Sequence, residues 1–247
     1  MCFIKTHKKK YFSIILFYLI VNVCYGSNFN LKEKILYKKE ILEKTVKIID
    51  FSNDIKFKHI EFGRLIPNNF TKKINHINID VNNSSSFLII PFEEIVTTNK
   101  VSFLWKSKGL IKIKDKNHEK SKLGDDAMLR IGLVTLKKNP NKLFDNIFGK
   151  PGWLRDVEET LVHKAGSLIY LLPKTKNKYP ETWNSPYSSL IKMVPTKTIF
   201  FSNDWNKSNI TFKKYFEVVG VIVMADGDNT NSNFETQLKS ISFDLKY

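Results

Sequence analysis

The sequence contains little cysteine, glycine or proline. Among its 247 residues there are two cysteines, Cys2 and Cys24, together with ten glycines and eight prolines. The low glycine and proline content excludes collagen-like and low-complexity chains, while 42% hydrophobic residues are enough for a packed core. Because no cysteine follows position 24, a thiol nucleophile and a cysteine-bound zinc site are excluded from the rest of the chain.

A long apolar segment is also lacking. Residues 1–26 carry lysines at positions 5, 8, 9 and 10, and the apolar run that follows, at 11–23, is too short to cross a ~30 Å hydrocarbon core comfortably. This pattern predicts a signal peptide at 1–26, and therefore export to the periplasm or the extracellular space. Acylation at Cys24 and retention as an uncleaved anchor are the alternatives. The uncleaved anchor would be the only contact of this protein with a membrane.

Arginine is scarce although the chain is basic. There are 40 Lys+Arg against 24 Asp+Glu, a net charge of +16, but only Arg64, Arg130 and Arg155 are arginines. Nucleic-acid-binding surfaces usually rely on the planar fork of arginine, and the lysines here are spread along the whole chain without a known nucleic-acid-binding motif. We therefore expect no nucleic-acid partner. A lysine-rich surface suits an anionic polymer of the cell envelope instead.

The apolar pattern changes from helical to strand-like near residue 50. Apolar residues three and four apart in Leu31–Ile49 predict an amphipathic helix, within a leader at 27–50. Residues 51–247 contain short alternating segments without regular helical crossovers, which predicts an all-β domain, an antiparallel β-sandwich of the jelly-roll type. We expect a short surface helix at 151–161 and a helical segment at 213–217. Strands are expected at 74–81, 86–91, 101–106, 125–135, 167–172, 198–202, 218–224 and 239–245.

Three sequence pieces resemble one protein family. They are GDDAMLRIGLV at 124–134, AGSLIYLLP at 165–173, and VVGVIVMADGDNTNSNFETQLKSISF at 218–243. Their order is similar to that in the bacterial domain-of-unknown-function family 3047 (DUF3047), and the turn at 226–230 is the most specific match. The resemblance implies an exported protein of unassigned activity. It also implies a sandwich similar to galactose-binding-like and other carbohydrate-binding jelly rolls.

The acidic turn is the first candidate site. Asp226, Asp228 and Asn229 offer hard oxygen ligands of the kind that calcium takes. The turn does not match an EF-hand, because Asn231 stands where that loop has glycine and Gln237 where it has glutamate. Three interpretations remain open: a structural turn, a loop that contacts a ligand, and a calcium site. No other cofactor is expected.

The second candidate is the pair formed by Asp126 and Arg130. On a strand, residues four apart lie on one face, where a carboxylate and a guanidinium can pair or bind sugar hydroxyls. Leu129, Ile131 and Leu133 would occupy the opposite face and enter the core. The alternative is an ion pair with a structural role, which holds the strand to the closing loop. If the fold brings Arg130 near the acidic turn, the two motifs form one site.

Aromatic residues form the third candidate group. Flat rings bind the C–H faces of sugars, and we select Trp153, Tyr170, Trp183 and Trp205 as candidate ligand-binding residues. Trp153 and Trp183 lie in turn-rich segments and are expected to be exposed. Trp105 shares its strand face with apolar residues and is expected in the core.

Together these features favour a non-catalytic binding module for carbohydrate or an envelope polymer. The sequence has no Gly-x-Ser-x-Gly elbow, no His-Glu-x-x-His motif and no phosphate-binding glycine loop. Two alternatives remain. One is a hydrolase of glycosidic or ester bonds built from distant carboxylates such as Asp126 and Asp228, and the other is a structural or protein-interaction role in the envelope.

Overall fold

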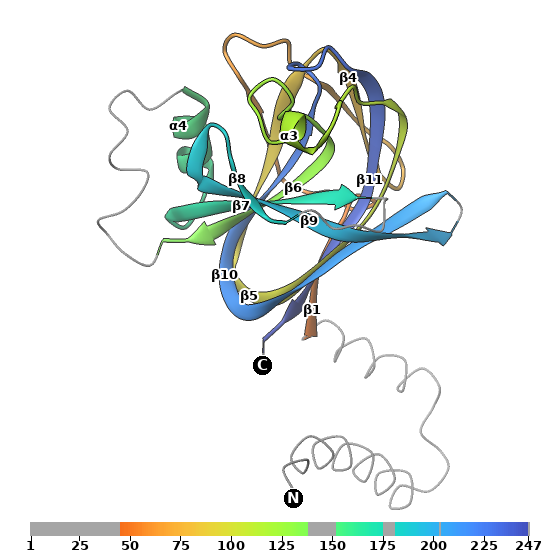
Figure 1. The fold of residues 1–247 in the computed structure, drawn as a ribbon. Coiled ribbons are helices and arrows are strands. Elements are labelled where there is room, and N and C mark those ends of the chain that lie inside the picture. The colour runs from red at the N-terminus through yellow and green to blue at the C-terminus, as the bar shows by residue number, and fades with distance from the viewer. Residues whose placement is uncertain (1–44, 138–151, 175–180, 203, 247) are drawn as a thin grey trace, which may run out of the picture. The chain divides into compact units, whose positions relative to one another are not determined.

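Strands make up most of the molecule. The computed structural model describes residues 45–137, 152–174, 181–202 and 204–246, and within these residues eleven strands belong to one sheet (Figure 1). No helix of the described residues is long and apolar enough to cross a membrane. The elements are β1 (Val46–Asp50), β2 (Lys58–Glu61), β3 (Asn69–Lys72), β4 (Ile77–Asn82), β5 (Ser85–Leu110), α3 (Lys116–Glu119), β6 (Ala127–Leu136), α4 (Gly152–Thr160), β7 (Ala165–Lys174), β8 (Trp183–Ser185), β9 (Ser188–Ser202), β10 (Trp205–Asp226) and β11 (Asn233–Leu245).

The sheet folds over on itself through its long strands. Its order is β3-β4-β11-β5-β10-β6-β7-β9-β8, with β1 added to β11 and β2 added to β5. The second half of β10 pairs with β6 and its first half pairs with β9, so that β10, β6, β7 and β9 form a closed circuit. The predicted all-β, sandwich-like fold is therefore confirmed. The pairing is antiparallel except between β7 and β9, which run parallel.

Several expected strands are parts of longer ones. The segments at 86–91 and 101–106 both belong to β5, and the segment at 218–224 is the second half of β10. The helical segment expected at 213–217 is wrong, because these residues continue β10 through an irregularity in its pairing with β5 between Thr211 and Phe216. Extra residues on one strand bend it, and this bend lets β5 and β10 serve both halves of the folded sheet.

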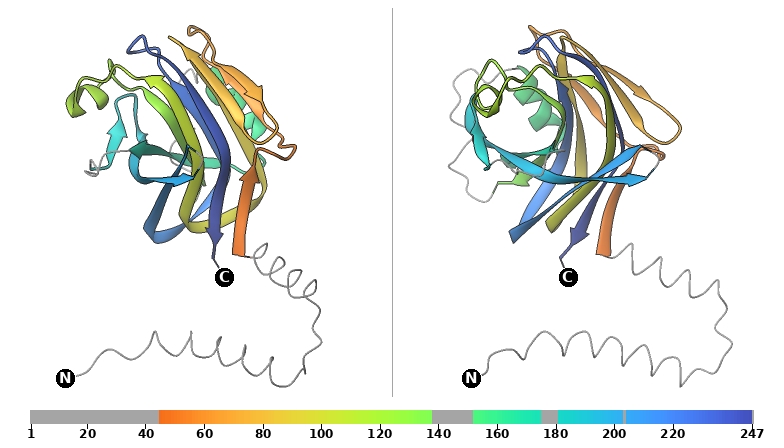
Figure 2. Two further views of the ribbon diagram at one scale, coloured as in Figure 1. Left: turned by 90° about the vertical axis from the view of Figure 1, so that its right-hand side faces the viewer. Right: turned by 45° about the vertical axis from the view of Figure 1, so that its right-hand side comes forward.

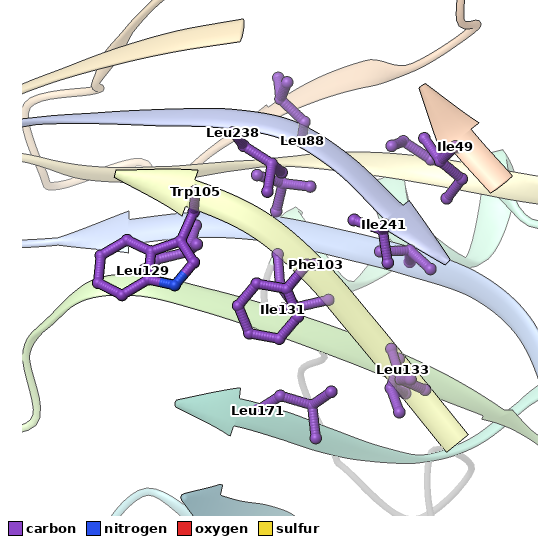
Figure 3. Packing of buried hydrophobic residues seen from close by; sticks show 14 of the residues in the cluster. Ile49, Leu88, Phe103, Trp105, Leu129, Ile131, Leu133, Leu171, Leu238 and Ile241 are labelled. Carbon is purple, nitrogen blue, oxygen red and sulfur yellow. The ribbon is translucent and has the colours of Figure 1, made fainter. Parts of the chain in front are cut away.

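The main hydrophobic core lies between the two halves of the folded sheet. Leu129, Ile131 and Leu133 of β6 enter this core, as predicted, and so does Trp105 of β5, which is 3% exposed (Figure 3). The indole nitrogen of Trp105 donates to Ser208 Oγ at 2.9 Å, which satisfies its one polar atom. The core therefore joins strands that are far apart in the sequence.

A second hydrophobic cluster covers the other face of β10. Val219, Ile222 and Met224 belong to this cluster, while Val221 and Val223 face the main core. Helix α4 packs against β2 and β5 and adds Val157 to the second cluster. Because β10 is buried on both faces here, its sequence is a nearly continuous apolar run. The short helix expected at 151–161 is confirmed as α4.

The structure describes only the last residues of the segment for which an N-terminal helix was predicted. The signal peptide and most of the helix expected at Leu31–Ile49 lie outside the described residues. Val46–Ile49 are wrong as helix, because they form most of β1 and pair with β11, where Ile49 lies opposite Ile241. The β-branched residues Val46, Ile48 and Ile49 favour a strand when an edge of a sheet is available.

Candidate functional site

The turn between β10 and β11 is fixed by backbone contacts. We call residues 226–232 the closing turn. The amide of Gly227 donates to the Ser84 carbonyl oxygen at 3.1 Å, and the amide of Ser232 donates to the Gly227 carbonyl oxygen at 2.9 Å. Asn231 adopts a φ of 49°, a conformation that asparagine tolerates better than most residues. The turn is therefore a defined structure, as its Asp-Gly-Asp-Asn sequence predicts.

Arg130 lies buried between two carboxylates. Its Nη1 donates to Asp226 Oδ2 at 2.8 Å and its Nη2 donates to Asp125 Oδ1 at 2.9 Å. The three side chains are 3 to 6% exposed, and the guanidinium carbon lies 5.7 Å from the centre of the Tyr170 ring. The expectation that Arg130 and the acidic turn form one site is therefore met. We call Asp125, Asp126, Arg130, Asp226 and Asp228 the Arg130 cluster.

One of the two partners of Arg130 is not the predicted one. Asp126 was expected on the strand face of Arg130, but Asp125 makes the ion pair. The reason is a bulge: between Ala127 and Arg130, β6 advances three residues while the facing part of β10 advances two. An extra residue reverses the alternation of side chains, so Asp125 reaches Arg130 and Asp126 faces the closing turn.

The carboxylate of Asp126 binds the closing turn through hydrogen bonds. Its Oδ1 accepts from the amide and the side-chain nitrogen of Asn229, at 3.3 and 3.0 Å, and its Oδ2 accepts from the amide and the hydroxyl of Thr230, both at 2.7 Å. Four donors on one carboxylate resemble the capping of a helix start, where a side chain satisfies free backbone amides. Asp126 is 1% exposed, so its role is to position the turn.

The cluster contains more negative than positive charge. Four carboxylates and one guanidinium would carry a net charge of −3 if all were ionised. Burial is the largest cause that raises the pKa of Asp226 well above its usual value; Arg130 opposes this shift, and Asp126 and Asp228 add to it. Asp226 Oδ1 is buried without a donor, and the carboxyl group of Asp228 lies within hydrogen-bonding reach of Asp226. The pair can therefore share a proton, or its charge can be balanced by a cation.

Three carboxylates could hold a metal ion. One oxygen each of Asp126, Asp226 and Asp228 lie within 4.8 Å of one another, and such hard oxygens suit calcium. The oxygens of Asp126 already accept four hydrogen bonds, so Asp226 and Asp228 have the greater free capacity. Asn229, the third predicted ligand, directs its side-chain nitrogen toward Asp126. Calcium at the closing turn stays a prediction.

Tyr187 is an exposed aromatic residue beside the closing turn. It lies in the turn between β8 and β9, and its side chain is 58% exposed. Its hydroxyl lies 3.3 Å from Asn229 Oδ1 and 3.2 Å from the Lys122 carbonyl oxygen, and it can donate to either. Burial of the hydroxyl, and then the nearby carboxylates of the Arg130 cluster, raise its pKa. Tyr187 was not among the residues predicted from the sequence. Its position after Pro186, in a turn-rich segment, was the available signal.

Trp153 and Trp183 are less exposed than expected. Trp153, at the start of α4, makes edge-to-face contacts with Phe62 and Phe87 at 5.8 and 6.2 Å between ring centres, so it packs on the second hydrophobic cluster. Trp183 packs on the same cluster from β8, with Lys120 Nζ 5.7 Å from the ring centre. Its indole nitrogen is buried without a hydrogen-bond partner. Trp183 shares the β8–β9 hairpin with Tyr187, whereas Trp153 serves packing.

Tyr170 and Trp205 occupy different places. Tyr170 is 7% exposed, its hydroxyl points to Met224 Sδ at 3.6 Å, and burial raises its pKa. Its ring lies beside Arg130 in the interior of the protein and exposes little surface to a ligand. Trp205 lies at the start of β10, where its ring contacts His76 and lysine side chains. The structure thus brings Tyr170 to the Arg130 cluster, and it gives Trp205 other neighbours.

Comparison of the sequence with models of known protein families gives no match, and comparison with curated proteins gives none either. The resemblance to DUF3047 therefore stays a prediction that rests on the three pieces quoted above.

Proposed function

We propose that the protein is an exported, non-catalytic module that binds carbohydrate at the closing turn. The observation that carries this proposal is the exposed ring of Tyr187 beside Asp228 and Asn229. Sugars are bound by a flat ring against their C–H face together with planar carboxylate or amide groups that hydrogen-bond neighbouring hydroxyls. Tyr187, Asp228 and Asn229 supply both kinds of group in one place.

The hydrogen bonds around the closing turn hold its side chains in position before a ligand binds. Asp126 fixes the backbone of Asn229 and Thr230, and Arg130 fixes Asp226 beneath them. A rigid site loses less conformational entropy when a ligand binds. The ligand would therefore contact the half-buried side chains of the turn, and the buried ion pairs would hold these in position.

The spacing of the carboxylates favours binding over hydrolysis. Glycosidases place their two carboxyl groups about 5 to 9.5 Å apart, on either side of the bond that is cleaved. One oxygen each of Asp126, Asp226 and Asp228 lie within 4.8 Å of one another, and Asp126 and Asp226 are buried, with hydrogen bonds to Thr230 and Arg130. This arrangement leaves Asp228 as the carboxylate of the three with the most freedom to meet a ligand.

A glycan array tests the proposal. The purified protein is applied to an array of oligosaccharides and envelope polymer fragments, and the best ligand is then titrated by calorimetry. Tyr187→Ala should weaken binding by about tenfold or more, the equivalent of one aromatic contact, and Asp228→Ala should also weaken it. The matched control is Tyr215→Ala, since Tyr215 is 48% exposed with Lys246 5.5 Å from its ring centre, much as Lys122 lies 5.7 Å from Tyr187. No bound glycan, or equal binding by wild type and Tyr187→Ala, would overturn the proposal.

A further inference from the structure

Two neighbouring hairpins carry a cluster of exposed apolar side chains. In the β9–β10 hairpin, Ile199, Phe200 and Phe201 are 44%, 69% and 53% exposed, and in the β3–β4 turn Ile74 is 95% exposed. We call these four residues the apolar edge. Single exposed apolar residues are common on protein surfaces, but a contiguous group of large ones marks a contact surface.

A ring contact joins the two hairpins. His76, two residues after Ile74, lies with its ring centre 5.8 Å from that of Trp205, and Trp205 pairs with Ser202 next to Phe201. The views in Figures 1 and 2 show the β9–β10 hairpin, in light blue, as an arm at the outside of the ribbon, and in the right view of Figure 2 its end lies next to the orange segment around β3. The apolar edge is therefore an outer ridge of the molecule.

Lysines surround the apolar edge. Lys207 Nζ lies 5.7 Å from the centre of the Phe201 ring, and Lys106 and Lys239 Nζ lie 5.1 and 5.9 Å from that of Trp205. Lys73 is near enough to act on His76, whose pKa is lowered first by burial and then by Lys106 and Lys73. Within the described part of the chain none of these four lysines forms an ion pair.

Two acidic side chains of the described residues can be assigned to the surroundings of the ridge. Asp204 follows the hairpin end, and Glu235 acts on His76 in the opposite sense to the lysines. Two acids against Lys73, Lys106, Lys207 and Lys239 leave the surroundings of the ridge positive. The partner that complements this surface therefore has a negative charge and an apolar layer behind it.

We propose that the apolar edge docks the protein onto the surface of an anionic phospholipid bilayer. Phe200 and Phe201 enter the boundary between headgroups and acyl chains, Trp205 lies at headgroup level, and the lysines contact lipid phosphates. Aromatic residues at the interface with lysines beside them are the side chains that such a surface favours. The lysine excess also favours a bilayer over a protein groove, because each lysine near an anionic surface strengthens binding by roughly fivefold.

This inference is independent of the carbohydrate proposal. The apolar edge and its lysines share no residue with the Arg130 cluster or with Tyr187. It gives a role to Trp205, which the sequence suggested as a sugar-binding residue, and it adds a membrane contact to the one predicted for an uncleaved signal segment.

Vesicle sedimentation tests this inference. The full-length protein is mixed with vesicles of pure phosphatidylcholine, and with vesicles that contain about 30 mol% phosphatidylglycerol to give a negative surface. Wild type should bind the anionic vesicles more strongly, and less so in high salt. Phe200→Ser with Phe201→Ser should lower the partition coefficient at least about tenfold, because two interfacial aromatic rings are removed. Lys207→Gln with Lys239→Gln should reduce binding to anionic vesicles alone.

The controls separate the apolar edge from other causes of binding. All variants carry the same residues 1–26, so any contribution of that segment is the same in each. Tyr215→Ser removes an exposed ring elsewhere and should bind vesicles like wild type, as should Tyr187→Ala. Equal binding of wild type to both kinds of vesicle, or binding of the Phe200 and Phe201 variant equal to that of wild type, would overturn the inference. Because the substituted side chains are exposed, thermal melts of all variants should coincide with that of wild type.

Discussion

Arg130 and Asp226 are 96 positions apart in the sequence, and their side chains meet at 2.8 Å in the interior of the protein. The contact links β6 to the end of β10, at the point where the chain enters the closing turn. A second carboxylate, that of Asp125, binds the other terminal nitrogen of the same guanidinium. Removing a charged group from water is costly, so this arrangement is stable only while all three groups are present.

Replacing Arg130 tests that dependence. Arg130→Met should lower the free energy of unfolding by about 3 to 5 kcal/mol, because Asp125 and Asp226 would stay buried without their cation. Arg130→Lys should have a smaller effect, since it keeps the charge but not the fork that reaches both carboxylates. Urea denaturation gives the free energies. The control is Arg155→Met, an exposed position on α4, where a change within about 0.5 kcal/mol is expected. Equal midpoints for Arg130→Met and Arg155→Met would contradict the structure.

The closing turn should depend on Asp126. Asp126→Asn would place an amide NH2 against donors on Asn229 or Thr230, and should cost about 2 to 3 kcal/mol, as expected for losing hydrogen bonds to a charged group. Hydrogen exchange at the amides of Asn229 and Thr230 should accelerate. Asp80→Asn on β4 is the control, because Asp80 is exposed and its contacts are with side chains. Unchanged exchange at Thr230 in Asp126→Asn would show that the carboxylate does not hold the turn.

The sequence was sufficient for the fold class because the apolar pattern is local. The run at 218–225 is apolar on both faces, and β10 is buried on both faces there. The length of β10 could not be predicted in the same way. Lys213 and Lys214 resemble a helix surface, and they continue the strand because β5 pairs on either side of them, with Thr211 and with Phe216. Pairing with a distant strand decides the outcome there.

The candidate site, like the fold, could be predicted from the sequence only in part. Arg130 stood out because arginine is rare in this chain, and the acidic turn stood out by its composition; both are in the cluster. The choice between Asp125 and Asp126 depended on one bulge residue, which only the pairing of β6 with β10 reveals. Tyr187 is brought to the turn by the β8–β9 hairpin, a tertiary relationship that no local pattern contains.

Stability should fall as the pH is lowered toward 5, in part because of His59. Burial lowers the pKa of His59 below 6.5, against a smaller opposing effect of Glu61, and its ring bonds Ser86 Oγ at 2.9 Å. The unfolded chain therefore binds a proton at a higher pH than the folded protein does. The contribution of His59 is complete above pH 6.5 and is lost as the pH falls from that value through the lower pKa of the folded protein.

Denaturation of His59→Gln measures this contribution. Glutamine keeps a hydrogen-bonding group near Ser86 and does not titrate, so the variant should lose less stability than wild type between pH 7 and 5. His76, whose pKa is also lowered by burial, should add a contribution of the same sign, and the double variant should have the flatter profile. Parallel pH profiles for wild type and His59→Gln would contradict the burial of a neutral ring.

Calcium is the last prediction, and Asp228 is the residue that tests it. With Asp226 buried and without a donor on Oδ1, a divalent cation between Asp226 and Asp228 would reduce the net negative charge of the cluster. Calcium at about 100 times its dissociation constant should stabilise wild type by about 2.7 kcal/mol, seen as a higher melting temperature, and Asp228→Asn should abolish the response.

Without calcium, Asp228→Asn should melt at or above the wild-type temperature, because it removes one of two adjacent carboxylates. Asp156→Asn, an exposed carboxylate on α4 paired with Lys58, should keep the full response to calcium. Identical melting curves of wild type with calcium and with a chelator would contradict calcium binding. A proton shared by Asp226 and Asp228 would then account for the close approach of the two carboxylates.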